Sequence, residues 1–197
     1  LTRLTAAAGK TDDWVSNSMY GSDRAELPAA GADTVTWNAY VDDDGTTNAT
    51  LWGDFNNDGW LDLVTGNYLQ ANRLYINRGD GTFEDATADW NAGNEGPCRS
   101  LHAADFDQDG WLDLYVVNIN SHNAMLRNTG GNGFQNITFP TGTVDTGIGM
   151  GALFYDSDND GDVDLYVTHD GNQVNKFFKN NGNGSFTECA AEVGLDY

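Results

Sequence analysis

Short apolar segments alternate with polar segments along most of this chain. The apolar segments are about five to seven residues long and rich in Val, Leu, Tyr, Phe and Thr, which is the length and composition of β-strands. The polar segments are rich in Asp, Asn and Gly, and the Gly-x-Gly sequences at residues 79–81 and 182–184 are typical of tight turns between strands. The apolar period of about 3.6 residues that indicates helices is not visible. The pattern therefore predicts an all-β fold.

The pattern occurs three times at a fixed interval of 51 residues. Each copy begins with the polar motif D-x-[DN]-x-D-G-x-x-D, at Asp54, Asp105 and Asp156. An apolar run, an Asn-flanked apolar pair, a Gly-rich turn and a Phe follow, so each copy is expected to form four strands. The first strands are expected around Leu51, His102 and Leu153, and the fourth strands are expected to begin at Phe83, Phe134 and Phe186.

A four-stranded unit of about 50 residues has the size of one β-propeller blade, whereas a β-sandwich would not produce a fixed repeat. We expect three blades, at about residues 48–98, 99–147 and 148–197. Residues 1–47 are expected to contain an N-terminal strand (1–9) and an extra segment with a β-hairpin. The turn of this hairpin is placed at residues 42–45, between 34–41 and 47–53.

Three blades are fewer than the four to eight of closed propellers, so the fold is expected to be an incomplete or open arc. Three interpretations are open. The chain is a fragment of a longer propeller, two chains close a ring, or chains stack head to tail through uncapped blade ends and form a filament. The chain begins at Leu1 rather than Met, which predicts a processed or excised product.

The repeated motif has the spacing of a cation-binding loop. Positions 1, 3, 5 and 9 supply side-chain oxygens, position 7 supplies a backbone carbonyl, and Gly at position 6 permits the sharp turn. This donor set suits Ca²⁺ better than Mg²⁺, and the absence of His and Cys from the motif disfavours zinc and copper. We expect about three Ca²⁺ ions. The predicted ligands are Asp54, Asn56, Asp58, Trp60, Asp62, Asp105, Asp107, Asp109, Trp111, Asp113, Asp156, Asp158, Asp160, Asp162 and Asp164.

An EF-hand is the competing interpretation of these loops. It requires a Glu at position 12, where this chain has Thr65, Val116 and Val167, and it requires helical flanks. The loops are therefore expected to join β-strands. The first loop carries Asn56 where the others carry Asp, so it has three ligand carboxylates against four and is expected to bind calcium most weakly.

Net charge limits the partners of this protein. Thirty acidic against nine basic residues give −21 at pH 7, which argues against nucleic acid and anionic membranes as partners. With 39% hydrophobic residues the chain can still build a core, and no apolar run approaches the roughly 20 residues that a membrane helix needs.

The motif and its following strand resemble the FG-GAP or VCBS-type repeat of integrin-α-like β-propellers. The phrases Gly81–Thr87 and Gly184–Ala190, which begin the fourth strands, add to this resemblance, and together the matching segments cover about residues 48–197. The resemblance implies a calcium-stabilised propeller, extracellular or at the cell surface, that serves adhesion or ligand binding. Such modules are seldom enzymes, so no catalytic residue and no organic cofactor are expected.

The histidines, cysteines and tryptophans are the other residues with chemical potential. His102, His122 and His169 are scattered, and the sequence places no acid–base partner for any of them. Cys98 and Cys189 are expected to lie too far apart for a disulfide within one chain. The side chains of Trp60 and Trp111 are expected to cover the metal loop or to pack between blades, while Trp14, Trp37, Trp52 and Trp90 are freer for a ligand. The sequons at Asn48, Asn136 and Asn183 are weakly consistent with secretion.

The sequence thus predicts a secreted, non-enzymatic calcium-binding repeat protein for adhesion or self-assembly, with a protein partner or head-to-tail association. Two alternatives remain: a carbohydrate-binding propeller module, and an accessory domain cut from a larger secreted enzyme.

Overall fold

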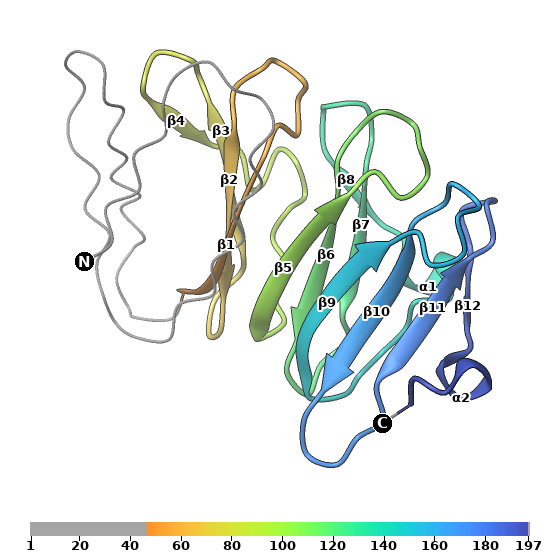
Figure 1. The fold of residues 1–197 in the computed structure, drawn as a ribbon. Coiled ribbons are helices and arrows are strands. Elements are labelled where there is room, and N and C mark those ends of the chain that lie inside the picture. The colour runs from red at the N-terminus through yellow and green to blue at the C-terminus, as the bar shows by residue number, and fades with distance from the viewer. Residues whose placement is uncertain (1–46, 197) are drawn as a thin grey trace, which may run out of the picture.

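The computed structural model describes residues 47–196, which form three four-stranded antiparallel sheets (Figure 1). The expected strand at residues 1–9 and the first half of the hairpin, with its turn at 42–45, lie outside the described residues. The first sheet contains β1 (Thr47–Gly53), β2 (Asp62–Asn67), β3 (Arg73–Asn77) and β4 (Phe83–Asp85). The second contains β5 (Cys98–Ala104), β6 (Asp113–Asn118), β7 (Ala124–Asn128) and β8 (Phe134–Asn136). The third contains β9 (Gly149–Tyr155), β10 (Asp164–His169), β11 (Lys176–Asn180) and β12 (Phe186–Glu188).

Each sheet is a simple meander in which sequential strands are neighbours. The strands are short and separated by Gly- and Asn-rich turns, which favour pairing between strands that are consecutive in the chain. The registers of the three sheets agree: Asp62 pairs with Gly53, Asp113 with Ala104 and Asp164 with Tyr155. The all-β, blade-like fold predicted from the sequence is confirmed, and the fourth strands begin at the three predicted Phe residues.

Helical structure in the described part of the chain is limited to two single turns. They are α1 (Thr138–Thr141) and α2 (Ala190–Val193), which follow the fourth strands of the second and third sheets. Each ends at a glycine in the left-handed region, Gly142 with φ 81° and Gly194 with φ 72°. Neither helix is long enough to cross a membrane, and residues 47–196 contain no other helix.

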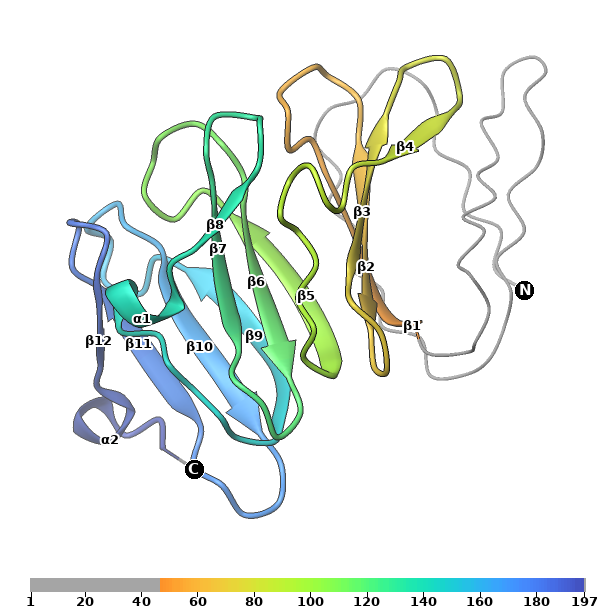
Figure 2. The same ribbon diagram turned by 180° about the vertical axis from the view of Figure 1, so that it is seen from behind.

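The three sheets stand one after another, and the apolar cores lie between them (Figures 1 and 2). The core between the first and second sheets includes Val64, Leu74 and Val116, and the core between the second and third includes Val117 and Leu165. Neighbouring sheets are in contact through their first strands, β1 with β5 and β5 with β9. Since no sheet has a core of its own, each blade depends on its neighbour for burial.

Two phenylalanines from the interstrand loops reach across these interfaces. Phe55 is fully buried and packs edge-on against Phe134 of the second sheet, with ring centroids 5.7 Å apart. Phe106 packs against Phe186 of the third sheet, with ring centroids 5.8 Å apart and the two rings tilted by 48°. Ser157 holds the corresponding place in the third repeat, and its hydroxyl donates a hydrogen bond to Asp164 of its own blade.

Candidate metal centres

The three acidic motifs form the loops between the first and second strands, at the same end of the three sheets (Figure 1). Loop 1 is residues 54–62, loop 2 is 105–113 and loop 3 is 156–164. The prediction that they join strands rather than helices is confirmed.

Each loop is folded by its own first and fifth residues. In loop 2, Asp105 accepts hydrogen bonds from the backbone N–H groups of Asp109 (3.0 Å) and Gly110 (2.9 Å), and Asp109 accepts one from the N–H of Trp111 (3.1 Å). Gln108 and Gly110 take the left-handed conformation, with φ 57° and 90°, which turns the chain around the carboxylates. Loops 1 and 3 contain the same bonds at the same positions.

The carboxylates at positions 1, 3 and 5 converge in the second and third loops. In each, one oxygen from each of the three residues lies within 4.8 Å of the others, a spacing at which one ion can touch all three. The groups are Asp105, Asp107 and Asp109 in loop 2, and Asp156, Asp158 and Asp160 in loop 3. In loop 2 the Oδ1 atom of Asp107 is buried without a hydrogen-bond partner, which is the arrangement of an oxygen prepared for a cation.

Loop 1 differs because Asn56 replaces the carboxylate at position 3. Its amide nitrogen donates a hydrogen bond to Asp58 Oδ2 (2.9 Å), and its Oδ1 accepts one from the N–H of Asp58 (3.1 Å). The Oδ1 atom of Asn56 therefore points into loop 1, as the carboxylates at position 3 do in loops 2 and 3. This oxygen is a weaker calcium donor than a carboxylate.

The aspartates at position 9 are buried and bind backbone amides. Asp113 is 1% exposed, and its two oxygens accept hydrogen bonds from the N–H groups of Phe106 (3.0 Å) and Asn128 (2.8 Å). Asp62 has the same two bonds, from Phe55 and Asn77. Burial raises the pKa of Asp62 to about 6 and that of Asp113 to about 7. A cation beside these two carboxyl groups would lower their pKa and favour the ionised form. Through their bonds to backbone amides, the two side chains also connect the strands to the loop, in addition to their predicted role as ligands.

The tryptophans at position 7 lie over the turn between the third and fourth strands of their own blade. A Cβ atom built on Gly79 would lie 2.7 Å from the indole of Trp60, and one built on Gly131 would lie 2.4 Å from that of Trp111. These two glycines are therefore required by the close approach of the indole ring. The sequence predicted that these rings cover the metal loop or pack between blades, and the structure shows that each ring contacts a turn of its own blade.

Neighbouring loops are joined by hydrogen bonds. The side-chain amide of Asn57 donates to the carbonyl of Gly110 (2.9 Å), and that of Gln108 donates to the carbonyl of Gly161 (2.9 Å). A second connection runs through the third strands: Asn128 donates to the carbonyl of Phe55 (2.8 Å). Asn180 donates in the same way to the carbonyl of Phe106 (2.9 Å). The three loops thus form one connected row.

Two basic side chains, which the sequence reasoning did not single out, reach the acidic loops. Arg127 on β7 pairs with Asp107 and Asp109, and Lys179 on β11 pairs with Asp158 and Asp160. The sequence contained a signal for them: a basic residue precedes the strand-ending Asn in both of the repeats with four predicted ligand carboxylates.

The sequence placed no acid–base partner for any histidine, and the structure provides one for His169. Its Nε2 lies 2.7 Å from Asp145 Oδ2, and both side chains are almost fully buried, at 1% and 5% exposure. Asn123 also donates to Asp145 (2.9 Å), so this cluster joins the second and third blades. His102 accepts a hydrogen bond from the N–H of Ala152 (3.0 Å), which is a packing role between the same blades. Burial lowers the pKa of His102 to about 4.

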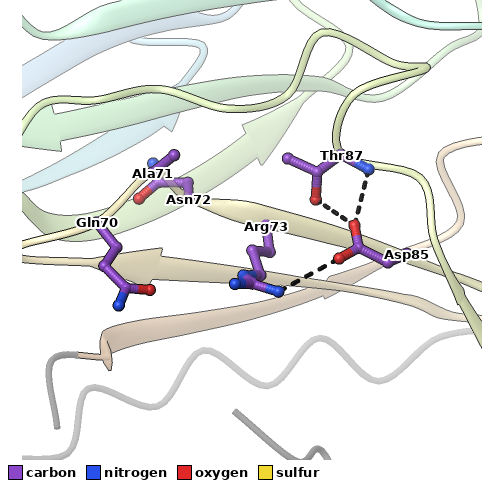
Figure 3. A pocket seen from close by; sticks show the side chains of 6 residues that line it. All are labelled: Gln70, Ala71, Asn72, Arg73, Asp85 and Thr87. Atoms are coloured by element: carbon purple, nitrogen blue, oxygen red, sulfur yellow. Dashed lines mark hydrogen bonds and ion pairs between the residues drawn. The ribbon is translucent and has the colours of Figure 1, made fainter. Parts of the chain in front are cut away.

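The cysteines and the surface depression give no catalytic arrangement. Cys98 and Cys189 are both free thiols. The depression shown in Figure 3 is lined by Gln70, Ala71, Asn72, Arg73, Asp85 and Thr87. Within it Asp85 accepts hydrogen bonds from Arg73 (3.4 Å) and from the N–H and hydroxyl of Thr87 (3.0 and 2.6 Å). These bonds stabilise the strand ends around the depression.

Three meander sheets with an acidic loop at one end of each define a class of protein, the repeat proteins built from propeller-type blades. The FG-GAP-like repeat family matches residues 54–116 and 105–167, and this chain belongs to that family.

Known relatives are named cartilage acidic protein 1. The mouse (Mus musculus) protein is 30% identical over 145 residues, which cover 68% of this chain and 22% of the relative. The human (Homo sapiens) protein is 32% identical over 127 residues, 59% of this chain and 19% of the relative. The Xenopus tropicalis protein is 34% identical over 128 residues, 59% of this chain and 20% of the relative. The chain thus spans about a fifth of the length of these relatives.

Proposed function

We propose that this chain is a non-enzymatic, extracellular calcium-binding repeat module, and that Ca²⁺ in the three loops stabilises the row of blades. The observation that carries the proposal is the convergence of three carboxylates in loops 2 and 3, at the positions where the sequence predicted ligands. The position-7 carbonyls and the buried position-9 aspartates would complete an oxygen-only donor set, which is the preference of Ca²⁺.

Calcium binding has a physical purpose in this architecture. Each loop holds three or four predicted ligand carboxylates, and their mutual repulsion opposes folding unless a cation offsets it. The loops are also joined to one another through Asn57, Gln108 and the strand-ending asparagines. Calcium bound in one loop would therefore stabilise the interface with the next blade as well.

Adhesion or self-association is the role that we propose for the module as a whole. Leu153 and Tyr155 on β9 are 57% and 42% exposed. Leu153 occupies the place that His102 holds on β5, where the equivalent face packs against the next blade. An apolar sheet face of this kind suits another protein surface or a second copy of the chain. The cartilage in the names of the relatives and the sequons support an extracellular location.

Two measurements test this proposal. Isothermal titration of the metal-free chain with CaCl₂ should give about three sites, and Asp105→Ala should remove one of them. Size-exclusion chromatography with light scattering should show an oligomer in Ca²⁺ that Leu153→Ser weakens, while Val193→Ser, which changes an equally exposed residue on α2, leaves it unchanged. A chain that takes up no calcium would refute calcium binding, and a monomer at every concentration would refute self-association.

A carbohydrate-binding role is the second candidate, favoured by the exposure of Trp60 (50%) and Tyr68 (43%). A glycan array in the presence of Ca²⁺ distinguishes it, since the absence of binding to any glycan would leave the first proposal alone.

A further inference from the structure

Loops 2 and 3 each contain a basic side chain placed directly among the predicted metal ligands. Arg127 Nε lies 2.6 Å from Asp107 Oδ2, and its Nη2 lies 3.1 Å from Asp109 Oδ2. In loop 3, Lys179 Nζ forms ion pairs with Asp158 and Asp160, the latter at 3.3 Å. In both loops the partners are the carboxylates at positions 3 and 5.

The fold fixes the positions of these two residues. Each immediately precedes the buried Asn whose backbone N–H binds the position-9 aspartate, Asn128 in the second blade and Asn180 in the third. That bond holds the end of the third strand against the loop, so the side chain one residue earlier starts close to the ligands. Within residues 47–196 the first blade has no such base, because Ile76 stands before Asn77 and packs against the apolar core.

We propose that Arg127 and Lys179 are built-in counter-ions of loops 2 and 3, which stabilise these loops without calcium and reduce their affinity for it. The inference rests on the proposed calcium binding and deepens it. Without metal, the basic group offsets the repulsion among the carboxylates. When Ca²⁺ enters, the base must move away from the ligand oxygens or remain beside a divalent cation, and either change opposes binding.

The counter-ions change the expected order of affinities. Loop 1 has three predicted ligand carboxylates, and loops 2 and 3 have four each. If the number of carboxylates alone decided affinity, loop 1 would bind calcium most weakly. At positions 1, 3, 5 and 9, one base in each of loops 2 and 3 leaves three unbalanced negative charges, the same number as in loop 1, and Asp162 adds one further charge at position 7 of loop 3. The three sites should therefore be closer in affinity than the motif suggests.

The test is calcium titration of Arg127→Gln, with melting of the same variant in EDTA. Arg127 is about two-fifths exposed (42%), so water screens its charge, and we expect calcium affinity at loop 2 to rise by about tenfold rather than more. In EDTA the variant should melt below the wild-type chain. Lys179→Gln should act on loop 3 in the same two directions, and Arg127→Lys, which keeps the charge, should restore affinity towards the wild-type value.

Arg78→Gln is the matched control. Arg78 pairs with Glu84 at 3.0 Å on the exposed surface of the first blade, so this change alters the net charge equally without touching a loop carboxylate. Calcium affinity should remain within about twofold of the wild type. If wild-type protein binds calcium but Arg127→Gln binds it equally or more weakly, the counter-ion role is wrong and the proposed function stands. If the wild-type chain binds no calcium, both are overturned.

Discussion

Asn128 joins three parts of the structure, and its removal should weaken the contact between the first two blades. The side chain is fully buried. Its Nδ2 donates to the carbonyls of Phe55 (2.8 Å) in loop 1 and Leu112 (3.0 Å) in loop 2, and its Oδ1 accepts from the N–H of Gly131 (2.8 Å). Asn128→Ala removes all three bonds and leaves the three backbone groups without these partners.

The cost follows from the burial of those groups. A buried polar group without a partner costs about 1–3 kcal/mol, and the two bonds within the second blade are partly accessible to water, so their groups fall at the lower end of this range. The sum is about 4 kcal/mol. For a unit of about 150 residues this lowers the melting temperature by roughly 10 °C.

Asn77→Ala provides the comparison. Asn77 donates to the carbonyl of Leu61 (3.0 Å) and accepts from the N–H of Gly79 (2.9 Å), which are the two bonds within a blade. In the described part of the chain it makes no bond to a preceding loop. Chemical denaturation at fixed saturating Ca²⁺ should therefore show Asn128→Ala about 1–3 kcal/mol less stable than Asn77→Ala. Equal losses for the two variants would refute the bridging role of Asn128.

Two further predictions concern single side chains. The pKa of His102 falls to about 4 in the folded state because the ring is buried, so its contribution to stability is present above about pH 6.5 and is lost as the pH falls towards 4. In EDTA, the free energy of unfolding of the wild-type chain should fall by up to about 3 kcal/mol more than that of His102→Gln as the pH drops from 6.5 to 4. Parallel curves of unfolding free energy against pH for the two proteins would contradict the lowered pKa of His102. Gly131→Ala should destabilise the second blade by more than Gly130→Ala. Both glycines have positive φ (74° and 80°), but only at Gly131 would the added Cβ meet the indole of Trp111. Equal melting temperatures of the two variants would contradict this contact.

The repeat made most of the fold predictable from the sequence. Three copies of one motif at one interval fix the strand order, because the same apolar and turn positions occur in each copy, and Phe83 begins a fourth strand as Phe134 and Phe186 do. The candidate ligands in the loops follow from spacing within nine residues, where local geometry decides which oxygens can meet.

The contacts that were missed depend on packing between distant segments. His169 meets Asp145 across 24 residues, through the segment that connects two blades, and no local pattern shows which polar residue lies opposite another there. The backbone bonds of Asp113 are similar, since its partner Asn128 is known only once the strand register is known. The recurrence of a base before Asn128 and Asn180 is visible in the sequence. That the Arg127 side chain reaches the loop 2 carboxylates depends on how Asn128 holds the end of the third strand, which the sequence does not show.

Thermal unfolding with and without calcium tests the central claim most directly. One bound ion adds about 2.7 kcal/mol of stability when its free concentration is a hundred times Kd. Three occupied loops should raise the melting temperature by about 15 °C or more over the value in EDTA. MgCl₂ at the same concentration should have a much smaller effect, because Mg²⁺ keeps its waters and demands stricter geometry. The account predicts this calcium-specific rise, and an identical melting curve in Ca²⁺ and in EDTA would contradict it.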